Sequence, residues 1–146
     1  LIQSFSDDVV VCFTDGACQG NPGPAGAGAV VKLPGGEVLE RYAALGEATN
    51  NVGELTAVEL ALELIDEAGV AADVDVELLT DSKYTFGVLQ QGWKAKANRE
   101  LILRVRDRLK KRPVRMHWIA GHVGVAENER ADALANLGVD ESRRHG

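Results

Sequence analysis

The chain has 146 residues, of which 45% are hydrophobic and 26% are charged, and its formal net charge at pH 7 is −6. This length and composition are typical of one globular domain with its own core. No apolar run approaches the roughly 20 residues of a membrane-spanning helix. The acidic net charge also argues against a protein that binds polyanions with its whole surface.

The N-terminus and the cysteines bear on the compartment. The first six residues lack both the basic start and the long apolar run of a signal peptide. Cys12 and Cys18 form neither a disulfide framework nor a Cys-x-x-Cys zinc pair, so we expect a cytoplasmic protein. The sequence does not begin with Met, which leaves open whether the chain is free-standing or one domain of a longer protein.

The first predicted element is a strand that ends on a carboxylate. Residues 9–13 form an apolar, β-branched run that predicts a strand buried on both faces, followed by Thr14, Asp15 and Gly16. An unpaired buried charge is costly, so we expect a cation, a hydrogen-bond network or water beside Asp15. A simple turn is the alternative, because Asp-Gly is a common turn dipeptide.

Two more strands and a helix are predicted next. Residues 16–24 have the composition of a loop, and residues 25–33 and 37–45 predict strands that complete an antiparallel meander. The apolar side chains of residues 52–68 have helical spacing. This helix is expected to end at Gly69 and to begin with a loose capping box formed by Asn51 and Glu54.

The second half alternates strands and helices. A strand at residues 74–80 ends on Asp81, and Ser82 is the expected N-cap of a short helix that ends near Gln91. After a connector, the remaining elements are a helix at 100–111, a strand at 114–119, a glycine loop at 121–124 and a helix at 127–137. Alternation in the strand at 114–119 places Trp118 in the core.

This order predicts an α/β fold. The sheet should be mixed and five-stranded, with a three-strand antiparallel meander, two parallel crossover strands and helices on both faces. One domain is expected at residues 9–138, with tails at 1–8 and 139–146 and fraying from Gly138 onward.

The charge is unevenly distributed. Ten of the 16 basic residues lie between Lys94 and Arg115, where only Glu100 and Asp107 oppose them, so this segment carries +8 and the rest of the chain −14. The segment is interpreted as a local face for a polyanion, with Lys94, Lys96 and Arg99 as the contacts, or as a solvated helix face.

Four acidic residues form a candidate metal site. Asp15 and Asp81 follow neighbouring predicted strands, Glu54 lies in the first turn of the helix between them, and Asp132 lies in the last helix after the loop that carries His122. Clustered carboxylates repel one another unless a cation is present, and oxygen ligands suit Mg²⁺ or Mn²⁺. Each residue also has an ordinary alternative role: capping for Asp81 and Glu54, a surface side chain for Asp132, and a plain loop residue for His122.

Five segments, in order along the chain, resemble the motifs of the type 1 ribonuclease H family. They are residues 13–24, 49–55, 80–84, 121–122 and 127–135. The resemblance extends from about Val9 to Leu137, nearly the whole chain, and five ordered motifs make it specific. It implies an RNase H-like fold and an endonuclease that hydrolyses the RNA strand of an RNA/DNA hybrid to give 5′-phosphate and 3′-hydroxyl ends.

The resemblance also implies roles for individual residues. Two Mg²⁺ ions, or Mn²⁺ as a substitute, would be held by Asp15, Glu54, Asp81 and Asp132, one activating the attacking water and the other stabilising the leaving oxygen. His122 resembles a histidine that assists proton transfer or product release, and Glu54 is also expected to orient the ribose 2′-OH. Besides the three basic contacts above, the residues expected to bind the hybrid are Gly16, Asn21, Thr49, Asn50 and Asn51.

The chain departs from the bacterial relatives that carry a helix-and-loop insertion rich in Lys and Trp, because only residues 92–99 occupy that place. We expect a monomer whose partner is the hybrid and not a membrane. Two other functions stay open at this point: another nuclease of the same broad fold, such as a resolvase or transposase-like domain, and a non-catalytic module that binds hybrids.

Overall fold

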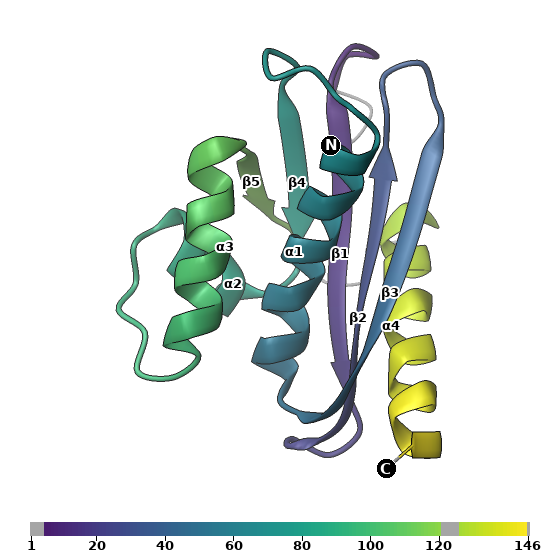
Figure 1. The fold of residues 1–146 in the computed structure, drawn as a ribbon, viewed down its shortest axis with the longest axis vertical. Helices are drawn as coiled ribbons and strands as arrows, with labels where there is room; N and C mark the ends of the chain where they lie inside the picture. Colours follow the sequence, from purple (N-terminus) through teal and green to yellow (C-terminus); the bar gives the residue numbers. More distant parts are fainter. Residues whose placement is uncertain (1–4, 121–125, 146) are drawn as a thin grey trace.

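Within residues 5–120 and 126–145, which the computed structural model describes, five strands form one mixed sheet in the order β3-β2-β1-β4-β5 (Figure 1). The antiparallel meander consists of β1 (Val10–Cys18), β2 (Gly23–Lys32) and β3 (Val38–Ala48). Two parallel strands extend it beyond β1, namely β4 (Val76–Thr80) and β5 (Arg115–Trp118). The predicted mixed topology is therefore confirmed.

Helices cover both faces of this sheet (Figure 1). One face carries α1 (Asn50–Glu67), α2 (Lys83–Gln90) and α3 (Arg99–Lys111), and the other carries α4 (Ala126–His145). Successive side chains of β1 point to opposite faces, so Val10 and Cys12 pack with α1 while Val11 and Phe13 pack with α4. This strand is buried on both faces, as its apolar run predicts.

The last helix is longer than the sequence pattern predicts. The expectation of fraying from Gly138 onward is wrong, because α4 continues to His145 and buries Val139 and Ser142. Gly138 lies so close to Ala43 and Gly26 that a Cβ there would overlap the backbone. Ser142 Oγ donates to the carbonyl oxygen of Ala25 at 2.8 Å. Gly138 thus allows close packing of the helix on the sheet instead of ending it.

The end of β1 differs from the predicted one. Its parallel pairing with β4 ends at Thr14 opposite Thr80, but its antiparallel pairing with β2 continues to Cys18. The predicted loop at 16–24 is therefore mostly strand. Asp15 lies just beyond the point where β4 stops, inside β1, so the simple turn is also wrong.

The N-cap of α1 differs from the predicted residue, whereas the N-cap of α2 is the predicted one. Thr49 is the N-cap of α1, and its Oγ1 accepts a hydrogen bond from the Val52 N–H at 3.2 Å. The capping box formed by Asn51 and Glu54 is therefore wrong, which leaves the Glu54 carboxyl group without that role. Ser82 caps α2 as predicted, because its Oγ accepts from the Thr85 N–H at 3.0 Å.

Among the described residues, no helix combines the length and the hydropathy that a membrane crossing requires.

Candidate active site

Three acidic side chains from separate elements meet at one end of the sheet. Among the described residues, Asp15 of β1, Glu54 of α1 and Asp81 after β4 each offer a carboxylate oxygen, and these oxygens lie within 4.8 Å of one another. Asp15 and Asp81 are adjacent because β1 and β4 are parallel neighbours whose pairing stops at the preceding residues. The convergence predicted from the sequence is present.

Gly16 allows Glu54 to come close to Asp15. A Cβ at Gly16 would overlap the backbone of Gly53 and Glu54, so only glycine lets the first turns of α1 lie directly against β1. The Gly16 N–H also donates to Oδ1 of Asp15 at 3.0 Å. This glycine therefore acts in the site through its backbone and its lack of a side chain.

Asp132 reaches the same site from the opposite layer. It lies on α4, and its carboxyl group hydrogen bonds with the side chain of Asp15. The structure thus brings together all four acidic residues singled out by the sequence. His122 lies outside the described residues.

Burial and mutual repulsion change the acidity of the two innermost groups. Burial, followed by the charge of Asp81 and by Asp132, raises the pKa of Asp15 to about 8. Burial, followed by the charges of Asp15 and Asp81, raises the pKa of Glu54 to about 10. A hydrogen bond between the two groups lowers the pKa of Asp15 and raises that of Glu54. These groups can all be ionised near neutral pH only if a cation compensates their charge.

The donor set fits a hard divalent cation. The cluster consists of carboxylate oxygens, which suit Mg²⁺ and Mn²⁺, and no thiolate belongs to it. Glu54 Oε2 is buried and finds no hydrogen-bond partner among the described residues. Buried polar atoms are normally satisfied, so this oxygen is placed as a metal ligand would be.

The expected hybrid-binding residues near α1 flank the acidic cluster. The N–H of Asn50 donates to Oδ1 of Asn21 at 3.1 Å, which ties the loop after β1 to the start of α1. Asn21 and Asn50 are exposed and Asn51 is half-buried. Thr49 uses its hydroxyl oxygen as the N-cap. Thr49, Asn50 and Asn51 precede Glu54 by three to five residues, which is about one helical turn.

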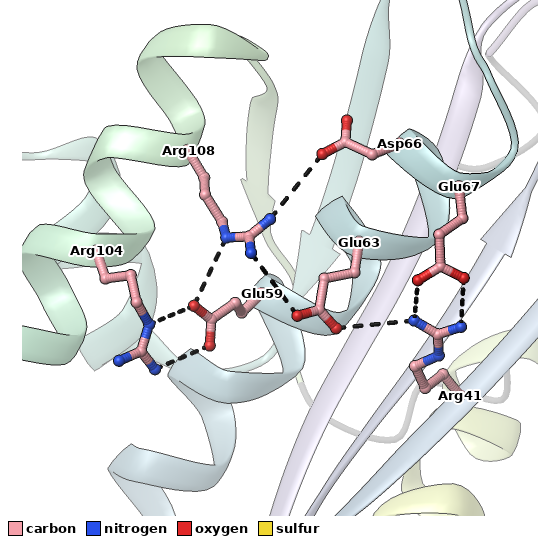
Figure 2. A network of polar contacts seen from close by, with 7 residues as sticks. All are labelled: Arg41, Glu59, Glu63, Asp66, Glu67, Arg104 and Arg108. Carbon is pink, nitrogen blue, oxygen red and sulfur yellow. Dashed lines mark hydrogen bonds and ion pairs between the residues drawn. The ribbon is translucent and has the colours of Figure 1, made fainter.

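The basic segment is less available to a polyanion than its sequence suggests. Figure 2 shows Arg104 and Arg108 of α3 pointing at the acidic row of α1. Arg104 Nη2 donates to Oε1 of Glu59 at 3.0 Å, and Arg108 Nε lies 3.7 Å from the same carboxyl group. Arg106 and Arg112 donate to backbone carbonyl oxygens of Val88, Trp93, Val70 and Ala71. These arginines therefore join α3 to its neighbours, while the basic side chains of α3 still include exposed ones, with Arg104 58% exposed and Lys110 80% exposed.

The three basic contacts predicted for the hybrid lie elsewhere, at the start of α3 and in the connector before it. A hollow of about 320 Å³ is lined by Trp93, Lys94, Arg99 and Leu103 among others. The Trp93 side chain is 48% exposed. Lys96 lies on the same connector. Lys94, Lys96 and Arg99 are exposed, although Arg99 Nε also donates to the carbonyl oxygen of Ala95 at 3.2 Å.

Trp118 is the residue that sequence reasoning misplaced. It is not in the core but 41% exposed, because it ends β5 at the edge of the sheet. Its indole Nε1–H donates to the carbonyl oxygen of Asp81 at 3.1 Å. In the sheet it lies opposite Thr80 in a parallel pair, one residue from Asp81, and the sequence alone carries no signal for this register.

Comparisons with known proteins identify the family of this chain. The RNase H family model matches residues 7–140. The ribonuclease H of Halorhodospira halophila is 43% identical and aligned over 91% of this chain and 94% of its own length. That of Alkalilimnicola ehrlichii is 44% identical, with 92% of this chain and 97% of its own covered.

Solved structures show the same fold. The N-terminal RNase H domain of a Mycobacterium tuberculosis protein, solved as a fusion with maltose binding protein, has a TM-score of 0.79 and 33% identity, with 93% of this chain and 96% of that chain covered. LC11-RNase H1 in complex with an RNA/DNA hybrid has a TM-score of 0.79 and 32% identity, with 92% and 99% covered. The match to the family model includes every strand of the sheet and all four acidic residues, and the chain belongs to the ribonuclease H family.

Proposed function

We propose that this protein is an endoribonuclease that hydrolyses the RNA strand of an RNA/DNA hybrid and leaves 5′-phosphate and 3′-hydroxyl ends. The observation that carries the proposal is the meeting of Asp15, Glu54 and Asp81 within 4.8 Å, with Asp132 hydrogen bonded to Asp15. Family membership supports it, as does the likeness to LC11-RNase H1, which was solved with a hybrid bound.

Each residue of the site has its own proposed role. The four carboxylates would hold two divalent cations, Mg²⁺ or Mn²⁺, which supply an activated water and stabilise the leaving oxygen when bound. Asp15 is the central group, because it contacts both Glu54 and Asp132 and is oriented by the Gly16 N–H. Glu54 has a buried oxygen without a hydrogen-bond partner among the described residues. This oxygen can coordinate a metal ion or accept a hydrogen bond from the ribose 2′-OH. His122 is proposed to assist proton transfer or product release.

Binding of the hybrid is proposed to involve two parts of the surface. The polar groups around the start of α1, namely Gly16, Asn21, Thr49, Asn50 and Asn51, would contact the backbone and the wide minor groove next to the metal site. Lys94, Lys96 and Arg99 would contact phosphates further along the duplex. We further propose that the protein acts as a monomer in the cytoplasm, free-standing or as one domain of a longer chain.

The proposal is tested with a hybrid labelled on either strand. We expect cleavage of the RNA strand in Mg²⁺, none in EDTA, and none of duplex DNA of the same sequence. The ends are checked by phosphatase treatment for the 5′-phosphate and by polymerase extension for the 3′-hydroxyl. Comparable cutting of duplex DNA or of the DNA strand would contradict the substrate assignment.

Asp15→Asn is the matched variant, since it keeps the shape of the side chain and removes its charge. We expect cleavage to be abolished, because a metal ligand is removed. The control is Asp140→Asn, which removes the same charge from an exposed position on α4, about two turns after Asp132. It should cleave like the wild type. An active Asp15→Asn protein would remove Asp15 from the site, and hybrid binding without cleavage by the wild type would indicate a non-catalytic module.

A further inference from the structure

Trp118 contacts the acidic cluster through the backbone of a proposed metal ligand. It is the last residue of β5, and its indole N–H donates to the carbonyl oxygen of Asp81 at 3.1 Å. The Asp81 carbonyl lies beyond the strand pairing of β4 and β5, which ends with Thr80 opposite Trp118. The indole therefore adds one hydrogen bond beyond the pairing of β4 and β5, and this bond holds Asp81 itself.

The two peptide units on either side of the Asp81 Cα are each held by β5. The Ile119 N–H donates to the Thr80 carbonyl oxygen at 2.9 Å, which holds the peptide before Asp81. The indole of Trp118 holds the peptide after it, and the N–H of that peptide, from Ser82, also donates to Oγ1 of Thr80 at 3.1 Å. The orientation of these two peptide planes determines where Cβ points. Their attachment therefore fixes the direction in which the Asp81 side chain leaves the backbone, and its carboxylate lies within 4.8 Å of those of Asp15 and Glu54.

Lys83 holds the indole from its open side. Its Nζ lies 5.0 Å from the centroid of the Trp118 ring, a cation–π distance. Lys83 is the first residue of α2, directly after the N-cap Ser82. The Trp118 side chain is therefore held by two contacts, the hydrogen bond to Asp81 and the cation–π contact with Lys83, although it is 41% exposed.

We propose that Trp118 is a positioning residue that sets the metal affinity of the site by orienting Asp81 through its backbone. The inference rests on the proposed function, since it takes the acidic cluster as a metal site. Groups that orient metal ligands typically change metal affinity by about 10–100-fold when they are removed. Because only one hydrogen bond to a backbone carbonyl is removed, we expect the lower end of this range.

The test measures Mn²⁺ binding without nucleic acid, by electron paramagnetic resonance of the free ion. Trp118→Phe keeps an aromatic face for Lys83 and removes the N–H, and it should weaken Mn²⁺ binding about tenfold. Replacing Trp118 by benzothienylalanine changes only the N–H to sulfur and should have the same effect. Trp93→Phe is the control, because Trp93 is similarly exposed but its ring packs against Gly87. It should bind Mn²⁺ like the wild type.

Kinetics provide a second readout that a purely structural role would not produce. In the Trp118 variants the turnover number should fall at limiting Mg²⁺ and recover when Mg²⁺ is raised about tenfold, with an unchanged Michaelis constant for the hybrid. Unfolding in EDTA should show that benzothienylalanine leaves the fold as stable as the wild type. Unchanged Mn²⁺ affinity in this variant, while the wild type binds more tightly than Asp15→Asn, would overturn the role of Trp118 alone. Equal Mn²⁺ binding by the wild type and Asp15→Asn would overturn the proposed metal site and this inference together.

Discussion

Asp15 illustrates at the scale of one residue how the site makes stability depend on pH. Its pKa is about 8 in the fold, against an ordinary value of 3.8, and that of Glu54 is about 10, against 4.5. The folded state therefore holds these protons more tightly than the unfolded chain does. Their contribution to stability is complete below about pH 4 and disappears as the pH rises through the folded pKa values. In EDTA, we expect the free energy of unfolding to fall between about pH 5.5 and pH 8.5, by at most about 1.4 kcal/mol per pH unit for each group.

Asp15→Asn should flatten this pH dependence, because the amide does not titrate and its neighbours are relieved of a repulsive charge. The measurement is urea unfolding in EDTA at the two pH values. At the higher pH the variant should be at least as stable as the wild type, although it is inactive. The Asp140→Asn control should follow the wild type. An equally steep fall in Asp15→Asn would show that Asp15 is already ionised in the fold.

At the scale of elements, ion pairs across the helical layer join α3 to α1. Glu59 of α1 is only 9% exposed, accepts hydrogen bonds from Arg104 and forms an ion pair with Arg108 at 3.7 Å, while Glu67 pairs with Arg41 of β3 at the surface (Figure 2). Glu59→Gln should lower the free energy of unfolding by about 1–2 kcal/mol, because a buried acceptor of charged hydrogen bonds is neutralised. Glu67→Gln should have a smaller effect, because exposed pairs are screened by solvent.

Urea unfolding at low and high salt distinguishes the two pairs. The effect of Glu67→Gln should shrink further as salt is added, whereas that of Glu59→Gln should persist, because a partly buried pair is screened less. Equal effects of the two variants would show that the Glu59 pairs stabilise no more than a surface contact.

For the whole molecule, the unequal charge distribution predicts how hybrid binding depends on salt. The segment between Lys94 and Arg115 carries +8, but several of its arginines are used within the fold. Substrate binding should then depend most on Lys94, Lys96 and Arg99. Replacing these three by Ala should raise the Michaelis constant and reduce the slope of log affinity against log salt by about 0.7–0.9 for each phosphate that is no longer neutralised. The turnover number at saturation should change little.

The slope is measured by hybrid binding in Ca²⁺, which is expected to occupy the site without supporting cleavage. A control that removes the same charge elsewhere replaces Lys110, Lys111 and Arg144, which are exposed at the ends of α3 and α4. It should change the slope less. Equal changes in the two triple variants would mean that only net charge matters, and an unchanged slope in the first would make the segment 94–99 a solvated surface.

Local patterns in the sequence were sufficient for the order of elements and for most of the acidic cluster. The apolar run of β1, the two further strands of the meander and the helical spacing of α1 depend on near neighbours along the chain, so local sequence patterns predict them. The proximity of Asp15 and Asp81 could be predicted, because parallel neighbouring strands end at the same edge of a sheet.

Features set by distant neighbours were decided only by the tertiary structure. Glycine after an apolar stretch usually ends a helix, but Gly138 continues α4 because the sheet lies directly against it. Alternation placed Trp118 in the core, yet an edge strand leaves it exposed, where it reaches the backbone of Asp81. Arg104 and Arg108 of α3 are paired because α1 presents carboxylates opposite them. Periodicity along the chain records which side of an element is apolar, whereas packing between elements decides what each side meets.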